Sequence, residues 1–493
     1  MRAASKFDPA FATATGAIAA LRSGAISSVE LTAHLFARIR QFNPRINAFV
    51  TLAEEAALAE ARKSDQSRAS RSASERPLEG LPITIKDAFA TAGLRTTAGS
   101  KPLDGFVPSE DAVAVARLRK AGAIIIGKTN LPEFSADLQA FNEVAGTTNN
   151  PWDLTRTPGG STGGGAAAIA SGFSYLELGS DSGGLIRIPA HFCGVFGHKS
   201  SIHLVSRTGW IPPMPGQLRG PNDISVSGPL ARSAVDLKLL LGVAAGKGPE
   251  DAIAWEARLP APRHRALRGF RIGWMMDDPY CPIAPESRAP LEQAIAAIRK
   301  SGARLDEGWP AGFALKRCHE SLRFLTTSYF ASTIRPQDKE ALRSELGGPH
   351  DEYARATLAA LDSTYVEWER VEVARLEHRR LWREYFRERD AFLMPVTIVP
   401  AIPHDHSMPR HHRTVMTGAG ARAYQDLSPW ISPAGLAGLP STVVPTGLSA
   451  QGLPVGIQIV GPYLEDLTPI ELATLLEGAL GGFRRPPMFQ PTK

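Results

Sequence analysis

Two glycine-rich segments that lie close together in the chain most constrain how it can fold. Residues 158–166 read Pro-Gly-Gly-Ser-Thr-Gly-Gly-Gly-Ala, and residues 179–189 read Gly-Ser-Asp-Ser-Gly-Gly-Leu-Ile-Arg-Ile-Pro. Because glycine has no Cβ, such segments let a ligand approach the main chain and let backbone N–H groups point into a pocket. Both segments therefore predict a site at which backbone N–H groups hold a reacting group, as in an oxyanion hole.

An alanine-rich run follows the first glycine segment. Residues 166–171 favour a helix, and Gly172 favours its end. The N-terminus of a helix carries a partial positive charge, which here would face Ser161 and Thr162. The pattern thus predicts that these two side chains lie at a polarised helix start.

Three known motifs fit these glycines less well. Residues 159–163 match the nucleophile elbow G-x-S-x-G, but that elbow follows a buried strand, whereas N-N-P-W-D precedes this segment at residues 149–153. Residues 181–184 resemble the nucleophile segment of trypsin-like proteases, with His34 as a possible base, but the flanking residues differ. A phosphate-binding loop needs a lysine after its last glycine, and none follows Gly165.

Taken together, the two segments resemble the amidase signature family, in which P-G-G-S-S-G-G is followed by G-x-D-x-G-G-S-I-R-x-P. Further pieces of that family's pattern occur in order along the chain, and the ordered set is specific where each single piece is weak. These pieces are L-P-I-T-I-K-D at 81–87, T-T-A-G-S at 96–100, G-K-T-N at 127–130, G-V-F-G-H-K at 194–199, G-P-L-A-R at 228–232 and G-L-P-V-G-I-Q at 452–458.

This resemblance implies an α/β fold, namely an α/β/α sandwich in which helices flank a large mixed central sheet. It also implies hydrolysis of a carboxamide C–N bond by a Ser, cis-Ser, Lys triad. Lys86 matches the family's lysine, which is desolvated so that its amine is neutral and acts as a base. Ser161 matches the bridging serine, which follows a cis peptide bond and relays the proton.

The same resemblance implies an oxyanion hole and a substrate-binding site around the second glycine segment. The residues assigned to it are Ser182, Gly183 and Gly184, whose N–H groups would hold the oxyanion, together with Thr162 and Asp181.

The sequence departs from the family pattern at the position of the attacking serine. With the residues on either side in register, that position is Leu185. Leucine offers neither a lone pair nor a proton, and removal of the nucleophile of a serine hydrolase costs on the order of a million-fold in turnover. Ser182 does not replace it, because Ser182 lies earlier in the expected oxyanion loop, and Ser180 lies earlier still.

Three interpretations of Leu185 stay open. In the first, the chain is an altered form of a working amidase. In the second, it is a relative in which Ser161 is the nucleophile of a Ser-Lys dyad with Lys86. In the third, it is a non-catalytic binding protein on the amidase scaffold. A buried, unpaired lysine is costly, so the retention of Lys86 counts against the third interpretation.

The composition is that of an ordinary globular protein. The 493 residues are 43% hydrophobic and 21% charged. The net charge of +6 is spread along the chain, and its densest basic stretch, residues 62–76, is serine-rich and interrupted by acids, which favours a solvated linker over a nucleic-acid site. No stretch approaches the roughly 18 apolar residues of a membrane span.

The chain has three cysteines, Cys193, Cys281 and Cys318, which lie far apart. Their number and spacing favour a reducing compartment over a disulfide framework or a metal site. We therefore expect a cytoplasmic protein without cofactor or metal. The expected partner is a small-molecule amide substrate, not nucleic acid or a membrane, and the resembled family implies a homodimer or a monomer.

The histidines are concentrated in one proline-flanked loop. His404, His406, His411 and His412 lie there, but no carboxylate or cysteine spacing completes a metal site. This pattern favours a loop over the pocket, without metal.

The sequence predicts one large domain with four parts. Residues 1–65 are expected to form N-terminal helices, and residues 75–245 the amidase signature core. Residues 246–390 are expected to form a variable, mostly helical cover with the substrate entrance. Residues 391–493 are expected to complete the core sheet.

Local signals predict the first elements. A capping box at residues 27–30 begins a helix that Asn43-Pro44 is expected to end. A second helix over residues 52–63 is expected to lead into a Ser/Arg-rich linker at 64–74. Residues 81–85 then predict a strand that delivers Lys86 at its C-terminal end, a usual place for a functional side chain in an α/β sheet.

Helical and strand patterns alternate along the rest of the chain. Further helices are predicted at residues 110–121, 233–243, 285–301, 365–389 and 469–480. Further strands are predicted at residues 123–126, 175–178, 441–445 and 453–460.

Overall fold

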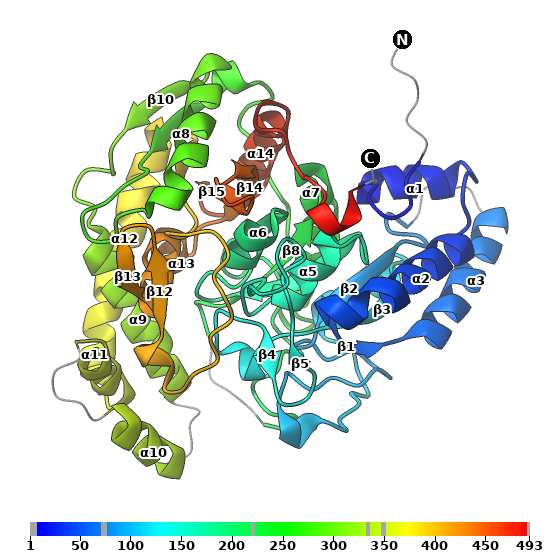
Figure 1. Cartoon of the computed structure of the whole chain (residues 1–493), viewed down its shortest axis with the longest axis horizontal. Coiled ribbons are helices and arrows are strands. Elements are labelled where there is room, and N and C mark those ends of the chain that lie inside the picture. The colour runs from blue at the N-terminus through cyan, green and yellow to red at the C-terminus, as the bar shows by residue number, and fades with distance from the viewer. Residues whose placement is uncertain (1–6, 71–75, 218–221, 332–335, 347–351, 491–493) are drawn as a thin grey trace.

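A mixed sheet of eleven strands forms the centre of the protein, with helices on both of its faces (Figure 1). The computed structural model describes residues 7–70, 76–217, 222–331, 336–346 and 352–490. From one edge to the other the strands are β1 (Phe49–Leu52), β3 (Ile124–Thr129), β2 (Pro82–Lys86), β6 (Leu176–Asp181), β8 (Val226–Ala231), β7 (Phe196–Lys199), β14 (Ser441–Leu448), β15 (Pro454–Val460), β11 (Ala391–Pro395), β9 (Arg271–Trp274) and β10 (Arg304–Glu307). The predicted α/β sandwich is therefore confirmed.

The strands that carry the predicted site lie side by side. β2 pairs in parallel with β3 on one side and with β6 on the other, and every residue of these three strands is buried. Parallel strands that are covered on both faces read as continuous apolar runs, as Ile83, Ile85 and the run from Ile124 to Ile126 do. Polar side chains at the ends of such strands stand out against this background.

Helices cover both faces of the sheet. α5 (Gly163–Ala170) and α6 (Arg187–Cys193) pack against each other and against the strands. α7 (Ala234–Ala244), α14 (Leu467–Leu480) and α8 (Pro285–Lys300) form a second row, in which α14 contacts both α7 and α8. α5 follows Ser161 directly, so the packing of α5 on the sheet fixes the position of that serine.

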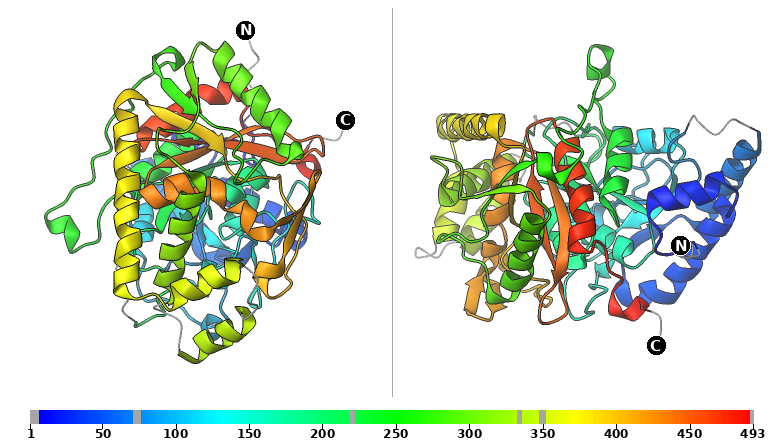
Figure 2. Two further views of the ribbon diagram at one scale, coloured as in Figure 1. Left: turned by 90° about the vertical axis from the view of Figure 1, so that its left-hand side faces the viewer. Right: turned by 90° about the horizontal axis from the view of Figure 1, so that it is seen from above.

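The remaining helices lie at the two ends of the molecule (Figures 1 and 2). Beside the β1 edge are α1 (Ala14–Arg22), α2 (Ser28–Ile46), α3 (Glu54–Ser70) and α4 (Val113–Lys120). At the far end are α9 (Leu315–Ala331), α10 (Pro336–Leu346), α11 (Glu352–Leu361), the long α12 (Tyr365–Glu388) and α13 (Ser432–Ala437). Two small two-stranded sheets complete the fold, β4 (Phe141–Asn142) with β5 (Gly146–Thr147) and β12 (Thr414–Thr417) with β13 (Gly420–Ala423).

The segment 246–390, expected to be a mostly helical cover, supplies helices α8 to α12 and also two strands, β9 and β10, of the central sheet. None of the helices in the described ranges combines the length and the apolar character that crossing a bilayer requires.

The predicted end of the first long helix is wrong. α2 begins after the capping box formed by Ser27 and Glu30, as expected, but it continues through Pro44 to Ile46. Asn47, in the left-handed conformation with a φ of 55°, ends it. The proline lies in the last turn, where it removes a single helical hydrogen bond, and the complete burial of Ile46 favours the added turn.

The predicted linker is wrong over its first half as well. Residues 64–70 continue α3, and tertiary contacts hold them: the Ser64 hydroxyl donates to Glu79 (2.6 Å), and Asp65 accepts from the N–H of Ser28 (2.8 Å). The second half of that predicted linker, residues 71–74, lies outside the described residues. The other predicted helices and strands are present, with ends shifted by a few residues.

The start of α5 is packed so closely that it requires glycine. A Cβ at Gly164 would lie 2.4 Å from the Asn130 nitrogen and 2.7 Å from the Ala48 oxygen, which are main-chain atoms. The first turn of α5 therefore rests directly on the chain that follows β3, and this contact holds Ser161 at the end of β2.

We predict that Gly164→Ala lowers the free energy of unfolding by about 1–3 kcal/mol, because overpacking forces main-chain shifts. Gly242→Ala is the matched control, since Gly242 is also helical but a Cβ there meets no atom within 4 Å. This control should be neutral or stabilising by up to about 1 kcal/mol. Denaturant unfolding followed by circular dichroism measures both, and equal effects would contradict the packing argument.

Candidate active site

Lys86 and Ser161 meet in the interior of the protein. Lys86 ends β2, and its Nζ lies 2.5 Å from the Oγ of Ser161 and 2.8 Å from the Oγ of Ser180. Lys86 and Ser161 are fully buried, and Ser180 is 3% exposed. The peptide bond between Gly160 and Ser161 is cis. The contact between Lys86 and Ser161 that the sequence predicted is therefore present.

Burial changes the chemistry of this lysine. Loss of hydration lowers the pKa of Lys86 from 10.5 to about 7, although the carboxyl groups of Glu177 and Asp181 act in the opposite direction. A substantial fraction of Lys86 is thus a neutral amine near neutral pH. A neutral amine can donate one hydrogen bond to Ser180 and accept another from the Ser161 hydroxyl, which is the arrangement that a general base needs.

A buried ion pair organises the second glycine segment. Arg187 donates from Nε to Oδ2 of Asp181 and from Nη2 to Oδ1, both at 3.0 Å. Burial by itself would raise the pKa of Asp181, but Arg187 and hydrogen bonding hold it at about 2, so the carboxylate stays ionised. Arg187 also donates to the carbonyl of Ile431 at 2.8 Å. The loop is therefore tied to the segment that precedes α13.

This ion pair also engages part of the expected oxyanion loop. The N–H of Gly184 donates to Asp181 Oδ1 at 2.8 Å, and the N–H of Ile186 donates to Oδ2 at 3.2 Å. Asp181 and the Gly184 N–H, which the resemblance assigned to oxyanion or substrate binding, are thus hydrogen-bonded to each other. The physical reason is that an ionised interior carboxylate requires several donors.

The other residues assigned to this site differ in their surroundings. The Ser182 hydroxyl donates to the Oγ of Ser225 at 2.6 Å. Gly183 faces open space, since a Cβ there would meet no atom within 4 Å. Thr162 joins the two glycine segments, because its hydroxyl donates to the Ser180 carbonyl at 3.3 Å. Of the expected donors, Gly183 is the one beside space that a ligand could fill.

Leu185 lies directly beside the first glycine segment. Its carbonyl accepts a hydrogen bond from the N–H of Thr162 at 3.1 Å, and the residue is 8% exposed. The branched apolar side chain therefore belongs to the neighbourhood of Ser161.

Two residues of this site escaped the sequence analysis, Ser180 and Glu177. Both lie on β6, and their proximity to Lys86 follows from the pairing of β6 with β2, in which Glu177 is opposite Thr84. The order of strands in the sheet supplies this information, and the sequence alone does not state it. The signal that was available is that Ser180 directly precedes the motif residue Asp181.

The histidine-rich loop forms no metal centre in the part of the chain that the structure describes, because no group of three or more potential ligands is brought together there. The His406 ring stacks on Phe141, with ring centroids 3.8 Å apart. The loop is tied to the chain near the site, since Gln139 Nε2 donates to the carbonyl of Asp405 at 2.6 Å.

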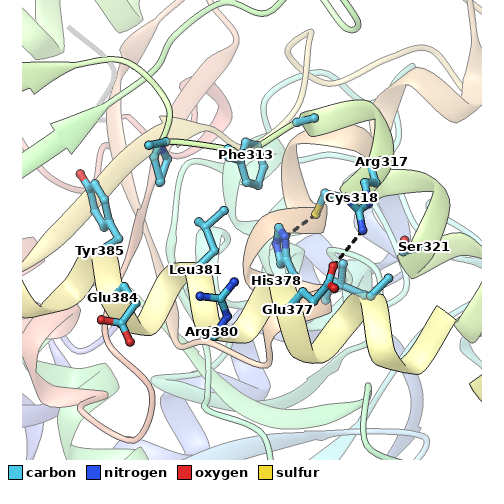
Figure 3. A pocket seen from close by; sticks show the side chains of 16 residues that line it. Phe313, Arg317, Cys318, Ser321, Glu377, His378, Arg380, Leu381, Glu384 and Tyr385 are labelled. Carbon is cyan, nitrogen blue, oxygen red and sulfur yellow. Dashed lines mark hydrogen bonds and ion pairs between the residues drawn. The ribbon is translucent and has the colours of Figure 1, made fainter. Parts of the chain in front are cut away.

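A cavity of about 490 Å³ lies elsewhere, between the start of α9 and the middle of α12 (Figure 3). None of the residues assigned to the site lines it. Its inner polar groups satisfy one another: the Cys318 sulfur lies 3.4 Å from His378 Nε2, which also accepts from Trp382 Nε1 at 3.1 Å. On its rim, Arg317 pairs with Glu377 at 3.0 Å. Nothing in this arrangement selects a ligand.

The chain is similar in sequence to proteins of one family. A model of the family described as Amidase matches residues 30–468. One similar protein is the amidase-type subunit of the glutamyl-tRNA(Gln) amidotransferase of Roseiflexus sp. (strain RS-1). It is 34% identical over 495 residues, which cover 93% of this chain and 94% of the relative.

Solved structures give the same result. The 6-aminohexanoate cyclic dimer hydrolase in complex with its substrate has a TM-score of 0.78 and 26% identity, and the match covers 98% of this chain and 100% of that one. A peptide amidase in complex with the competitive inhibitor chymostatin has a TM-score of 0.76 and 27% identity, with 97% and 100% covered. These likenesses extend over the whole fold, the sheet and the helical cover included.

We predict that Asp181→Asn lowers the free energy of unfolding by about 3–5 kcal/mol at pH 7, because it leaves the buried Arg187 without its counter-charge. Asp104→Asn is the control, since Asp104 pairs with Arg95 and Lys101 at the surface and its loss should leave the denaturation midpoint close to that of the parent. Similar midpoints for the two variants would show that the interior pair does not hold the loop.

We also predict a pH-dependent stability effect of Lys86→Met. The folded-state pKa of Lys86, about 7, is below the ordinary value of 10.5, so the parent loses stability as the pH falls from 10.5 to 7, where only the unfolded chain takes up the proton. The variant lacks this loss. Its melting temperature relative to the parent should therefore be highest at pH 7 and decline towards pH 10.5.

Lys101→Met is the control for this measurement, because Lys101 is exposed and has no burial penalty. Its melting temperature relative to the parent should not change with pH over the same range. A flat difference for Lys86→Met would mean that Lys86 is not desolvated.

Proposed function

The chain belongs to the amidase family, and on that premise we propose that it hydrolyses the C–N bond of a carboxamide, with Lys86 as the base and Ser161 as the nucleophile. One observation supports this above all others. The amine of Lys86 lies 2.5 Å from the Ser161 hydroxyl, in an interior where burial lowers the lysine pKa to about 7. A hydroxyl beside a desolvated amine is the activated pair of a Ser-Lys hydrolase.

The proposed reaction has two halves. In the first, Ser161 Oγ bonds to the carbonyl carbon while its proton moves to Lys86 Nζ; the C–N bond then breaks, and the leaving amine takes that proton. In the second, Lys86 removes a proton from water, the resulting hydroxide attacks the acyl-Ser161 ester, and Ser161 recovers its proton as the acid departs. Ser180 holds the amine by a second hydrogen bond, which directs its lone pair towards Ser161.

The developing oxyanion would be stabilised beside Gly183. The open space over this residue supports its N–H as a donor, whereas the Gly184 N–H is already bonded to Asp181. The N–H of Ser182 is the proposed second donor, because it belongs to the same loop and the Ser182 side chain is fixed by Ser225.

A second candidate function follows from Leu185. Its place beside Thr162 puts an apolar side chain where the resembled family carries its attacking serine, and Ser161 is fully buried. The chain would then be an altered amidase, with Lys86 and Ser161 in their ordinary roles as base and relay but with no group to form the acyl-enzyme. Restoring serine at position 185 would restore hydrolysis.

We also infer a reducing, cytoplasmic setting for the protein. Its three cysteines, Cys193, Cys281 and Cys318, are buried free thiols. Burial raises the pKa of Cys193 and Cys318 well above the usual value, so these thiols stay protonated and unreactive. Buried thiols without disulfides are typical of cytosolic proteins.

The proposed roles predict a clear pattern of activities on a panel of aryl and alkyl amides. The parent should hydrolyse at least one amide, and Ser161→Ala and Lys86→Met should each lower kcat/KM by at least about a thousand-fold, because each removes one member of the reacting pair. Ser171→Ala is the control for the serine, since Ser171 follows the same helix, is equally buried, and its hydroxyl has no hydrogen-bond partner.

Leu185→Ser separates the two candidates. Hydrolysis by the parent that is lost in Ser161→Ala supports the Ser-Lys dyad. Hydrolysis that appears only after Leu185→Ser supports the altered amidase. The absence of hydrolysis from both forms would reject both candidates and leave a binding role on the amidase scaffold.

A further inference from the structure

One buried carboxyl group near Lys86 has no part in the reaction as described so far. Glu177 lies in the middle of the sheet on β6, fully buried, and is opposite Thr84 on the neighbouring strand β2, two residues before Lys86. Acidic side chains are almost never fully buried without a counter-charge in contact. Glu177 makes no such contact among the described residues, so its presence calls for a role.

The surrounding structure is shaped to hold this carboxyl group. The Thr129 hydroxyl donates to Glu177 Oε1 at 2.6 Å. Above it, α5 carries glycine at position 165, where a Cβ would lie 2.5 Å from Cδ, Cγ and Oε1 of the glutamate. The absence of a side chain at Gly165 therefore makes the space that Glu177 fills, directly beneath the helix that begins beside Ser161.

One oxygen of this carboxyl group is left over. Oε2 of Glu177 is buried and has no hydrogen-bond partner. Leaving an interior carboxylate oxygen unpaired is costly, so a proton favours this group. Burial accordingly raises the pKa of Glu177 to about 7, against the opposing effects of nearby hydroxyl groups and of the lysines Lys86 and Lys128.

The charged groups around Glu177 are few. Lys86 on β2 and Lys128 on β3 act on it, and Lys128 is already compensated by Asp87, with Nζ and Oδ1 3.6 Å apart. The neighbouring strand β8 and the covering helix α5 carry no titratable side chain. On α7, Asp236 accepts hydrogen bonds from the start of α1. At its own strand end, Asp181 is paired with Arg187.

Lys86 is therefore the uncompensated positive group that Glu177 faces. The two make no direct ion pair, since Lys86 contacts the hydroxyls of Ser161 and Ser180 instead. Their interaction acts through the low-dielectric interior, where charges attract over longer distances than in water. A neutral amine with a protonated carboxyl group carries the same net charge as an ammonium with a carboxylate.

We propose that Glu177 is a positioning residue for charge: its carboxylate supplies the counter-charge that stabilises the ammonium form of Lys86 when the lysine takes up the proton of Ser161. This proposal rests on the proposed function for its role in turnover, but the coupling between the two groups does not. Glu177 touches neither the substrate nor the serine, and it acts through Lys86.

The experiment follows the protonation of Lys86 directly. The protein is labelled with ¹³C at lysine Cε, the Lys86 signal is identified by its absence from Lys86→Met, and its pH titration is compared in the parent and in Glu177→Gln. Glutamine keeps the size of the side chain and can still accept from Thr129. Removing the negative charge should lower the pKa of Lys86 by about one unit, the lower end of the effect of a nearby opposite charge.

Glu477→Gln is the control, because the pKa of Glu477 is also raised by burial while this group lies on α14 and is not among the charges that act on Lys86. It should leave the Lys86 titration unchanged. A Lys86 midpoint that is the same in Glu177→Gln and in the parent would overturn the proposal.

Two further readouts make the result independent of folding defects and of the proposed reaction. Should Glu177→Gln fail to fold, the reverse measurement applies: in Lys86→Met the pKa of a ¹³C-labelled Glu177 should rise, because coupling between two sites is reciprocal. No rise would overturn the proposal.

Where hydrolysis is measurable, the acid limb of kcat/KM should move to lower pH in Glu177→Gln by the same amount as the Lys86 titration. A shifted titration with a parent that hydrolyses no amide would refute the proposed function and leave the coupling standing. An unshifted titration in an active parent would refute the coupling alone.

Discussion

The exclusion of water from Lys86 is the constraint on which the rest of the site depends. Three lysines of the central sheet are fully buried, and they differ in their partners. Lys128 pairs with Asp87 and donates to the Phe89 carbonyl, and Lys199 donates to the Leu439 carbonyl. Such partners favour a fixed ammonium. Lys86 instead meets hydroxyl groups, which can exchange a proton with it, and this difference separates a structural lysine from one equipped for acid–base chemistry.

The two glycine segments form one rigid unit around that lysine. The Asp181–Arg187 pair fixes the second segment, and Thr162 joins it to the first through bonds with Ser180 and Leu185. Within this frame the segments divide their tasks. Gly184 serves the internal ion pair, while Gly183 faces open space. A leucine in such a frame cannot move aside easily, because interiors are close-packed and resist deformation, so the chemistry of position 185 has to be judged together with that of Ser161.

The charges of the site are balanced without a direct ion pair. A glutamate and a lysine, both buried and both with a pKa near 7, occupy neighbouring strands without touching. Gly165 is the residue that permits this, because any side chain there would collide with Glu177. A glycine that reads in the sequence as one more member of a flexible run is, in the folded protein, the space for an acidic side chain. The same run thus provides close helix packing at Gly164 and room for a carboxyl group at Gly165.

The sequence by itself determined the family, the α/β architecture and the meeting of Lys86 with Ser161, because these depend on ordered motifs and on apolar runs that are readable locally. It misjudged the end of α2 and the start of the linker after α3, where burial of Ile46 and contacts of Ser64 and Asp65 override local signals. Only the tertiary structure decided that Ser180 and Glu177 adjoin Lys86 and that the Gly184 N–H is turned to Asp181. These facts depend on which strands are neighbours and on which groups lose their water, and both are set by contacts between residues far apart in the chain.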